Sequence, residues 1–131
     1  MSKIKLFFVV ALILILVVIF IKFQYRVDLR ELELNDIVIG YTPDAKDIKI
    51  SDDTQIRNII EILDTKSWSI YFWWRIKSAP SLILVIDETM IGLFEFDRNY
   101  GVVEGNGKTR YYKIPQNTYE KIYNYYKEQS N

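Results

Sequence analysis

Carboxylates and aromatic rings are the side chains of this sequence that could do chemistry, because the chain has neither histidine nor cysteine. It therefore lacks the commonest general acid–base group, the thiol nucleophile and the usual ligands of zinc, haem and iron–sulfur centres. A glycosidase would need two carboxylates placed across a cleft. Five acids cluster along the strand-forming segments of the second half: Asp87, Glu88, Glu95, Asp97 and Glu104. Their spacing does not demand such a pair, so we expect solvated acids, no enzyme activity and no cofactor, with a carboxylate-based hydrolase as an alternative.

The second candidate is an aromatic segment, SWSIYFWWRIKSAP, at residues 67–80. If residues 68–77 form a strand, alternation directs one set of side chains into the core: Trp68, Ile70, Phe72, Trp74 and Ile76. The opposite face then holds Ser69 and the candidate contact residues Tyr71, Trp73, Arg75 and Lys77. Trp, Tyr and Arg are frequent anchors of interfaces, and Trp or Tyr beside basic residues also suits a membrane surface. Three hypotheses for Trp73 stay open: cover by the C-terminal helix or a loop, membrane-surface contact, or a ligand or partner site.

An uninterrupted apolar run, LFFVVALILILVVIFI, extends from Leu6 to Ile21 with a lysine on either side. As a helix it would be about 24 Å long, somewhat shorter than a hydrocarbon core of about 30 Å. A cleaved signal peptide would need a small-residue site after the run, and the following KFQYRVDLRELEL offers none. We therefore predict an uncleaved transmembrane signal anchor over residues 6–23, with the lipid bilayer as its partner.

Charge divides the chain into two parts. Residues 1–27 carry four basic residues and no acid, so residues 28–131 hold 13 basic residues (17 − 4) against 17 acids, a net charge of −4. An acidic domain is a poor partner for phosphate backbones, and we expect no nucleic-acid binding.

The basic residues also bear on orientation. Lys3 and Lys5 favour a cytoplasmic N-terminus by the positive-inside rule, although Lys22, Arg26 and Arg30 oppose it. We expect a cytoplasmic tail at 1–5, a juxtamembrane linker at 24–34 and an extracytoplasmic domain at 35–131, localised at the cell membrane.

Two segments of that domain have helical periodicity. In residues 51–67, Asp52 and Gln55 have the spacing of a capping box, ahead of one apolar stripe: Ile56, Ile59, Ile60 and Leu63. Asp52 and Asp53 suit the helix dipole better than a metal site. Near the C-terminus, capping-box spacing recurs at Asn117 and Glu120, and a second stripe accompanies it: Tyr119, Ile122, Tyr123 and Tyr126.

The remaining segments predict antiparallel strands. Residues 35–41 and 46–50 flank a turn with Pro43, and residues 81–87 are apolar on both faces. Residues 90–97 alternate, which places Met90, Phe94 and Phe96 on one face. Asn106-Gly107 predicts a type I′ hairpin rather than a phosphate loop, because no lysine–serine tail or helix follows. The fold class is therefore α+β: an N-terminal transmembrane helix, then a small antiparallel meander sheet with two packed helices.

The order of these features resembles that of a group of small proteins of unknown function. The stretches that carry the resemblance are ISDDTQIRNIIEIL, SAPSLILVI, YGVVEGNGKTRYYKIP and YEKIYNYY. They cover most of residues 46–128. Together with the apolar N-terminus they look like small membrane-anchored or exported proteins of low-GC Gram-positive bacteria. The resemblance implies an extracytoplasmic α+β domain and defines no catalytic residue.

The sequence thus predicts a single-pass, membrane-anchored protein of the cell envelope whose domain binds something without catalysis. A possible partner is another envelope protein. The alternative is an accessory or immunity-type subunit of a larger membrane protein, with the transmembrane helix in the interface. Ala11 is the only small residue of that helix, and close helix packing favours small residues.

Overall fold

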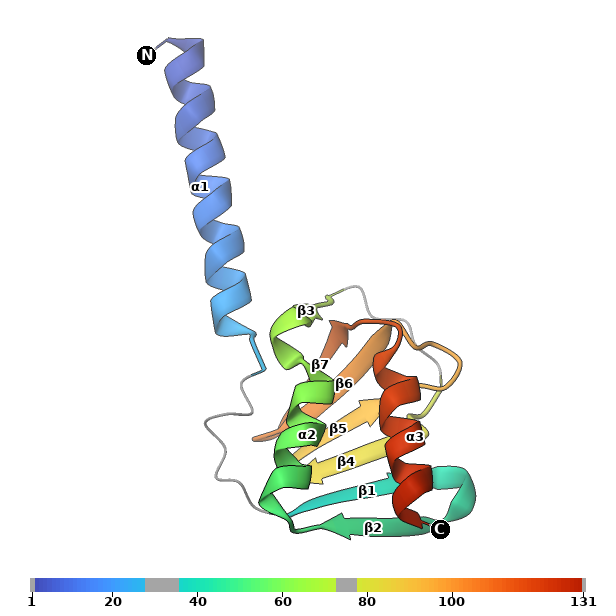
Figure 1. The fold of residues 1–131 in the computed structure, drawn as a ribbon. Helices are drawn as coiled ribbons and strands as arrows, with labels where there is room; N and C mark the ends of the chain where they lie inside the picture. Colours follow the sequence, from blue (N-terminus) through green and yellow to red (C-terminus); the bar gives the residue numbers. More distant parts are fainter. Residues whose placement is uncertain (1, 28–35, 73–77, 131) are drawn as a thin grey trace.

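The computed structural model describes residues 2–27, 36–72 and 78–130. Helix α1 (Lys3–Gln24) projects from one end of an α+β domain (Figure 1). The elements of that domain, in chain order, are β1 (Ile37–Tyr41), the 3₁₀ turn η1 (Thr42–Asp44), β2 (Lys46–Ile50), α2 (Asp53–Leu63), η2 (Thr65–Ser67), β3 (Ser69–Ile70), β4 (Leu82–Ile86), β5 (Thr89–Leu93), β6 (Tyr100–Gly105), β7 (Lys108–Lys113) and α3 (Thr118–Ser130). The predicted α+β class is confirmed.

The strands form one antiparallel sheet in the order β2-β1-β4-β5-β6-β7-β3. Its centre is the predicted meander, since β4 to β7 pair in sequence. The β1–β2 hairpin joins this meander through β1 and β4, whereas β3 pairs with β7 at the other edge. The two edge strands, β2 and β3, therefore both precede the meander in the chain.

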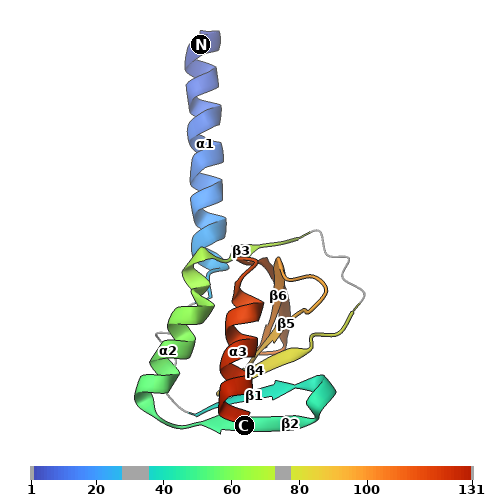
Figure 2. The same cartoon turned by 45° about the vertical axis from the view of Figure 1, so that its right-hand side comes forward.

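Both domain helices lie side by side on one face of the sheet (Figures 1 and 2). Three members of each predicted apolar stripe are buried: Ile56, Ile59 and Leu63 on α2, and Tyr119, Ile122 and Tyr126 on α3. The fourth members, Ile60 and Tyr123, are half-buried and pack against the same core. The N-cap of α2 is also as predicted, because the backbone N–H of Gln55 donates to the Asp52 carboxylate at 3.0 Å. The main core lies between these helices and the sheet.

The predicted hairpin at Asn106-Gly107 is confirmed by its backbone. Asn106 has φ 52° and Gly107 has φ 73°, and a type I′ turn needs positive φ at both positions. The strands it joins, β6 and β7, pair in register up to Gly105 and Lys108.

The predicted strand at residues 90–97 is too long, because β5 ends at Leu93. Beyond that point a turn begins, in which the Arg98 side chain donates to the Glu95 carbonyl at 3.0 Å and the Tyr100 N–H donates to the Asp97 carbonyl at 3.2 Å. Phe94 is buried, but Phe96 is 91% exposed. The expectation that both rings share one face of a strand is therefore wrong.

Candidate functional site

Only part of the predicted contact face falls within the described residues. Tyr71 is half-buried; its N–H donates to the Tyr111 carbonyl at 2.8 Å, and its ring packs against Tyr100 with centroids 4.9 Å apart. The other predicted members of that strand lie outside the described residues: Trp73, Trp74, Arg75, Ile76 and Lys77. The three hypotheses about the surroundings of Trp73 therefore stay predictions.

The described part of the predicted strand at 68–77 corrects one side chain. Trp68 is buried as expected, and its indole N–H donates to the Leu63 carbonyl at 2.9 Å. Phe72 was predicted in the core, and this is wrong, because its side chain is 59% exposed. β3 comprises only Ser69–Ile70. Phe72 lies beyond the backbone bond from Tyr71 to β7, so the pleat of the sheet does not direct its ring inward.

Phe72 instead contributes to a cluster around Tyr25, the residue that ends α1. The Tyr112 hydroxyl donates to the Tyr25 carbonyl at 2.8 Å. The ring of Phe72 meets the Tyr25 ring edge-on, with centroids 5.5 Å apart and planes at 87°. The guanidinium carbon of Arg110 lies 4.8 Å from the centroid of the same ring. We call Tyr25, Phe72, Arg110 and Tyr112 the helix-end cluster.

Burial determines the chemistry of this cluster. The pKa of the Tyr112 hydroxyl is raised by desolvation, and a hydrogen bond with Arg110 opposes that rise. The hydroxyl is therefore protonated at neutral pH and remains a donor to the Tyr25 carbonyl. Two residues further on, Val27 packs against the main core. The segment predicted as a linker thus begins with residues that contact the domain.

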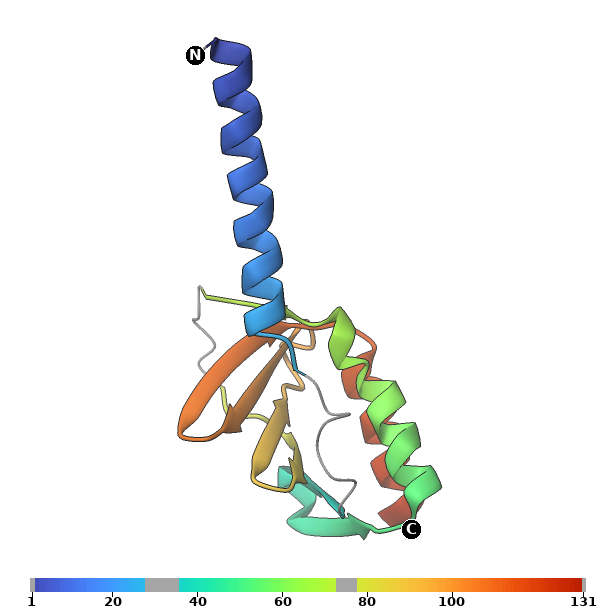
Figure 3. The same cartoon turned by 90° about the vertical axis from the view of Figure 1, so that its left-hand side faces the viewer.

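Helix α1 itself stands apart from the domain (Figure 3). It is long and apolar enough to cross a membrane, and none of its residues is buried by the rest of the described chain. Lys22 lies in its last turn, and the Arg26 guanidinium carbon lies 4.8 Å from the centroid of the Phe23 ring. This helix is compatible with the predicted membrane anchor.

A second candidate surface lies on the sheet face opposite the helices. Because Ile37, Ile39 and Leu84 point into the main core, their neighbours along the strands point to the other face. Val38 and Val85 are two such neighbours. Strand register extends this face across the sheet as one transverse row of six residues: Lys49, Val38, Val85, Met90, Glu104 and Thr109. We call them the open-face row. Val85, on the interior strand β4, is 38% exposed.

The neighbouring row on this face is covered in part by the chain itself. A Cβ added to Gly92 would lie 2.8 Å from the Pro80 Cβ and 2.6 Å from Val102 Cγ1. Val102 and Phe94 are buried although both lie outside the main core. The chain therefore builds a small second core beside β5 and β6, and the open-face row lies next to it with a partly exposed apolar centre.

A third cluster joins α3 to the sheet. The Tyr41 and Tyr123 rings are 5.2 Å apart, Tyr119 stacks on Tyr123 at 6.1 Å, and Lys127 lies 5.5 Å from the Tyr123 centroid. Burial raises the pKa of both Tyr41 and Tyr119. Lys127 also forms an ion pair with Asp44 at 3.4 Å. The rings and the Lys127–Asp44 pair contact one another, so we assign this cluster to the packing of α3 against the sheet.

The five acids considered for catalysis fall into two groups. Asp87 and Glu88 connect β4 to β5, and Glu104 pairs with Met90 near the same end of β5. Glu95 and Asp97 follow the other end of β5. Because this strand has five residues and so spans about 16 Å, the two groups of acids lie at opposite ends of it. Within the three described ranges, no three acidic side chains gather as a metal ion would require.

Sequence reasoning missed the helix-end cluster and the open-face row. An aromatic residue just after an apolar span is itself a signal of a membrane interface, and it would have marked Tyr25. The apolar pattern on both faces of residues 81–87 predicts a covered strand, so it gave no signal of the exposed Val85. The chain matches no known protein family, no curated protein and no solved structure. The resemblance to Gram-positive envelope proteins therefore stays a prediction.

Proposed function

We propose that the chain is a single-pass membrane protein whose α+β domain is a non-catalytic interaction module of the cell envelope. The observation that supports this most directly is the connection between α1 and the domain. An apolar helix with no buried residue ends at Tyr25, and Tyr112 fixes that residue by a 2.8 Å hydrogen bond. Such an attachment presents the domain in a defined position at the membrane.

The open-face row is the surface that we assign to a protein partner. An antiparallel sheet with one solvated face ordinarily alternates apolar-in and polar-out, whereas this row has Val38, Val85 and Met90 at its centre. Lys49 and Glu104 lie on either side of that centre. An apolar centre with a polar rim is the usual anatomy of a protein interface.

The proposed topology has a cytoplasmic N-terminus and an outer domain, and the absence of cysteine makes it straightforward to test. Single-cysteine variants Ser2→Cys and Gln129→Cys of the full chain are treated with a membrane-impermeant maleimide on intact cells. We expect labelling of residue 129 alone before lysis and of both residues after lysis. Labelling of residue 2 alone on intact cells would reverse the proposed orientation, and a shortened mature chain would contradict the uncleaved anchor.

The proposed interaction surface is tested by co-purification from detergent-solubilised membranes after cross-linking. We expect Val85→Lys to remove a specific cross-linked partner, while Lys121→Glu, at an exposed position of α3, leaves the partner bound. Loss of the same partner when α1 is exchanged for an unrelated apolar helix, with Val85→Lys unaffected, would favour the accessory-subunit alternative.

A further inference from the structure

The position of Phe72 relative to α1 leads to a second contact with the membrane. We propose that the end of the domain that carries the helix-end cluster docks on the bilayer surface, with Phe72 at headgroup level and nearby basic side chains against anionic phospholipids. This inference rests on the proposed membrane span of α1. The lipid surface would then cover a face of the domain that continues directly from that helix.

The short distance between Phe72 and the end of α1 limits the depth of the Phe72 ring. If residues 6–23 span the hydrocarbon core, Tyr25 begins about 3 Å beyond it along the helix axis. The headgroup layer on each side of the core is about 5–8 Å thick. The Phe72 centroid lies 5.5 Å from that of Tyr25, so the ring has little room to leave this layer. In Figures 1 and 3, β3 lies at the end of the domain from which α1 projects.

The short length of the anchor also favours contact between the domain and the headgroups. The uninterrupted apolar run of 24 Å or so is shorter than the hydrocarbon core. A short span is accommodated by thinning of the bilayer and by drawing the flanking residues toward the interface. Because Tyr25 and Val27 contact the domain, the domain moves with the end of the helix. The mismatch therefore brings the helix-end cluster toward the headgroups.

Side-chain chemistry fits a lipid surface at this point. Outside α1, the exposed large apolar side chains among the described residues are Phe72, Val85 and Phe96, and Phe72 is the one that packs on Tyr25. Trp and Tyr concentrate at the membrane–water interface, and Phe inserts its apolar ring there from segments that lie on the bilayer surface. An exposed Phe that costs solubility elsewhere is favourable there.

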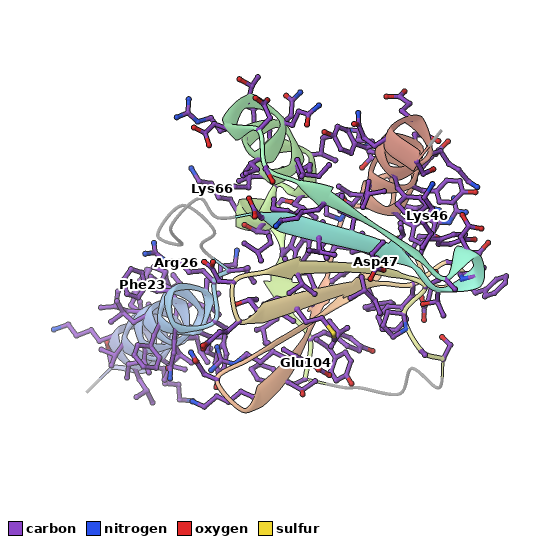
Figure 4. All side chains as sticks on the ribbon, turned by 90° about the horizontal axis from the view of Figure 1, so that it is seen from below. Phe23, Arg26, Lys46, Asp47, Lys66 and Glu104 are labelled. Atoms are coloured by element: carbon purple, nitrogen blue, oxygen red, sulfur yellow. The ribbon has the colours of Figure 1, made fainter. Side chains whose placement is uncertain are left out.

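Basic residues surround the same end. Arg26 follows Tyr25, Lys66 lies in η2 just before β3, and Lys113 pairs with Ser69 of β3. All three are exposed, and the C-cap residue Asp64 is an acid of the same turn. Figure 4 shows Lys66 on the side of Phe23 and Arg26, with Lys46 on the opposite side. Basic side chains beside a bilayer are attracted to anionic lipids. This face therefore suits contact with anionic phospholipid headgroups.

The test uses spin labels on single-cysteine variants of the full chain in vesicles of phosphatidylcholine and phosphatidylglycerol. Labels at Ile15→Cys, Ser69→Cys and Gln129→Cys report their depth through collision with oxygen and with a water-soluble nickel complex. We expect residue 15 near the bilayer centre, residue 69 at headgroup depth and residue 129 in water. In vesicles of phosphatidylcholine alone, the label at residue 69 should shift toward the aqueous value.

The outcomes separate the two proposals. A label at residue 15 that is accessible to water contradicts the membrane span, and so the proposed function. Residue 15 in the bilayer with residue 69 fully in water overturns the docking inference alone.

A double variant tests the side chains themselves. Phe72→Ser with Lys66→Glu should shift the label at residue 69 toward water, whereas the charge-matched control Lys46→Glu should leave it unchanged. An unchanged depth in the double variant would overturn the role of these residues. If the double variant unfolds, Lys113→Glu in the intact Phe72 background serves as the second variant, with the same shift expected.

Discussion

The Tyr112 hydroxyl forms a hydrogen bond between the domain and the end of α1, beside the ring contacts of Phe72 and Arg110 with Tyr25. Its ring is 2% exposed and packs beside Trp68 at 6.1 Å, while its oxygen reaches the Tyr25 carbonyl. We expect Tyr112→Phe to lower the free energy of unfolding by about 0.5–1.5 kcal/mol, the usual net value of one hydrogen bond. Urea denaturation of the full chain in detergent micelles measures this, and an unchanged unfolding midpoint would show that the bond contributes nothing.

Tyr125, in contrast with Tyr112, has a hydroxyl group that forms no hydrogen bond in the described structure. That hydroxyl is buried. Desolvation raises its pKa, and the charges of Asp52 and Glu128 add to that rise. A buried unpaired hydroxyl is costly, so we expect Tyr125→Phe to leave the free energy of unfolding unchanged or to raise it by up to about 1 kcal/mol.

The matched comparison is Tyr126→Phe, on the next residue of α3. The Tyr126 hydroxyl donates to the Lys46 carbonyl at 2.8 Å, and its removal should destabilise the domain. Equal losses in the two variants, measured by the same denaturation, would contradict the assignment of Tyr125 as unpaired.

At the scale of the element, the close approach of two segments over β5 determines what Gly92 tolerates. A Cβ at this position would meet Val102 Cγ1 at 2.6 Å and Pro80 Cβ at 2.8 Å. We expect Gly92→Ala to cost about 1–3 kcal/mol of unfolding free energy through overpacking. Gly105→Ala on β6 is the control, because its nearest contact would be Thr89 Oγ1 at 3.4 Å. Similar unfolding midpoints for the two variants would indicate that Pro80 yields easily.

The elements with strong local signals could be predicted from the sequence. The spacing of Asp52 and Gln55, the apolar stripe of α2 and the pair Asn106-Gly107 each involve residues a few positions apart, and the structure confirms them. Their geometry depends on local backbone rules. Pairing partners in the sheet depend on distant residues, which explains why the edge position of β3 was not anticipated.

The candidate surfaces were harder to predict for the same reason. Phe72 continues the alternation of Trp68 and Ile70, but β3 leaves the sheet before it, and only the contact with Tyr25 explains its exposure. Similarly, Val85 looks like a core residue by composition. Its 38% exposure follows from the placement of both helices on the other face, which periodicity within one strand cannot reveal.

At the scale of the whole molecule, the stability of the domain depends on tyrosines. The chain contains ten tyrosines and no histidine or cysteine, so few side chains can change charge between about pH 6 and 9. Burial is the largest cause of a raised pKa at five tyrosines: Tyr41, Tyr112, Tyr119, Tyr125 and Tyr126. All five hydroxyls are therefore protonated across this range.

This pattern predicts a flat stability profile that falls in alkali. A tyrosine whose pKa in the folded state lies above its ordinary value of 10.0 binds its proton more tightly when folded. Its contribution is complete below about pH 10 and is lost as the pH rises through the raised pKa. We expect constant unfolding free energy from about pH 6 to 9 and cooperative unfolding above about pH 10. A phenolate at these partly buried positions loses hydration that the unfolded chain restores, so ionisation favours unfolding.

Tyrosinate absorbance and circular dichroism, followed together in one titration of the full chain in micelles, measure this directly. The five tyrosines whose pKa is raised by burial should ionise only as the dichroism signal collapses. The variant Tyr126→Phe removes one of these groups, so the absorbance step that accompanies the collapse should be smaller. Ionisation of all ten tyrosines in a single step near pH 10.0, with the fold intact, would mean that these rings are accessible to water and that the core between α3 and the sheet is loosely packed.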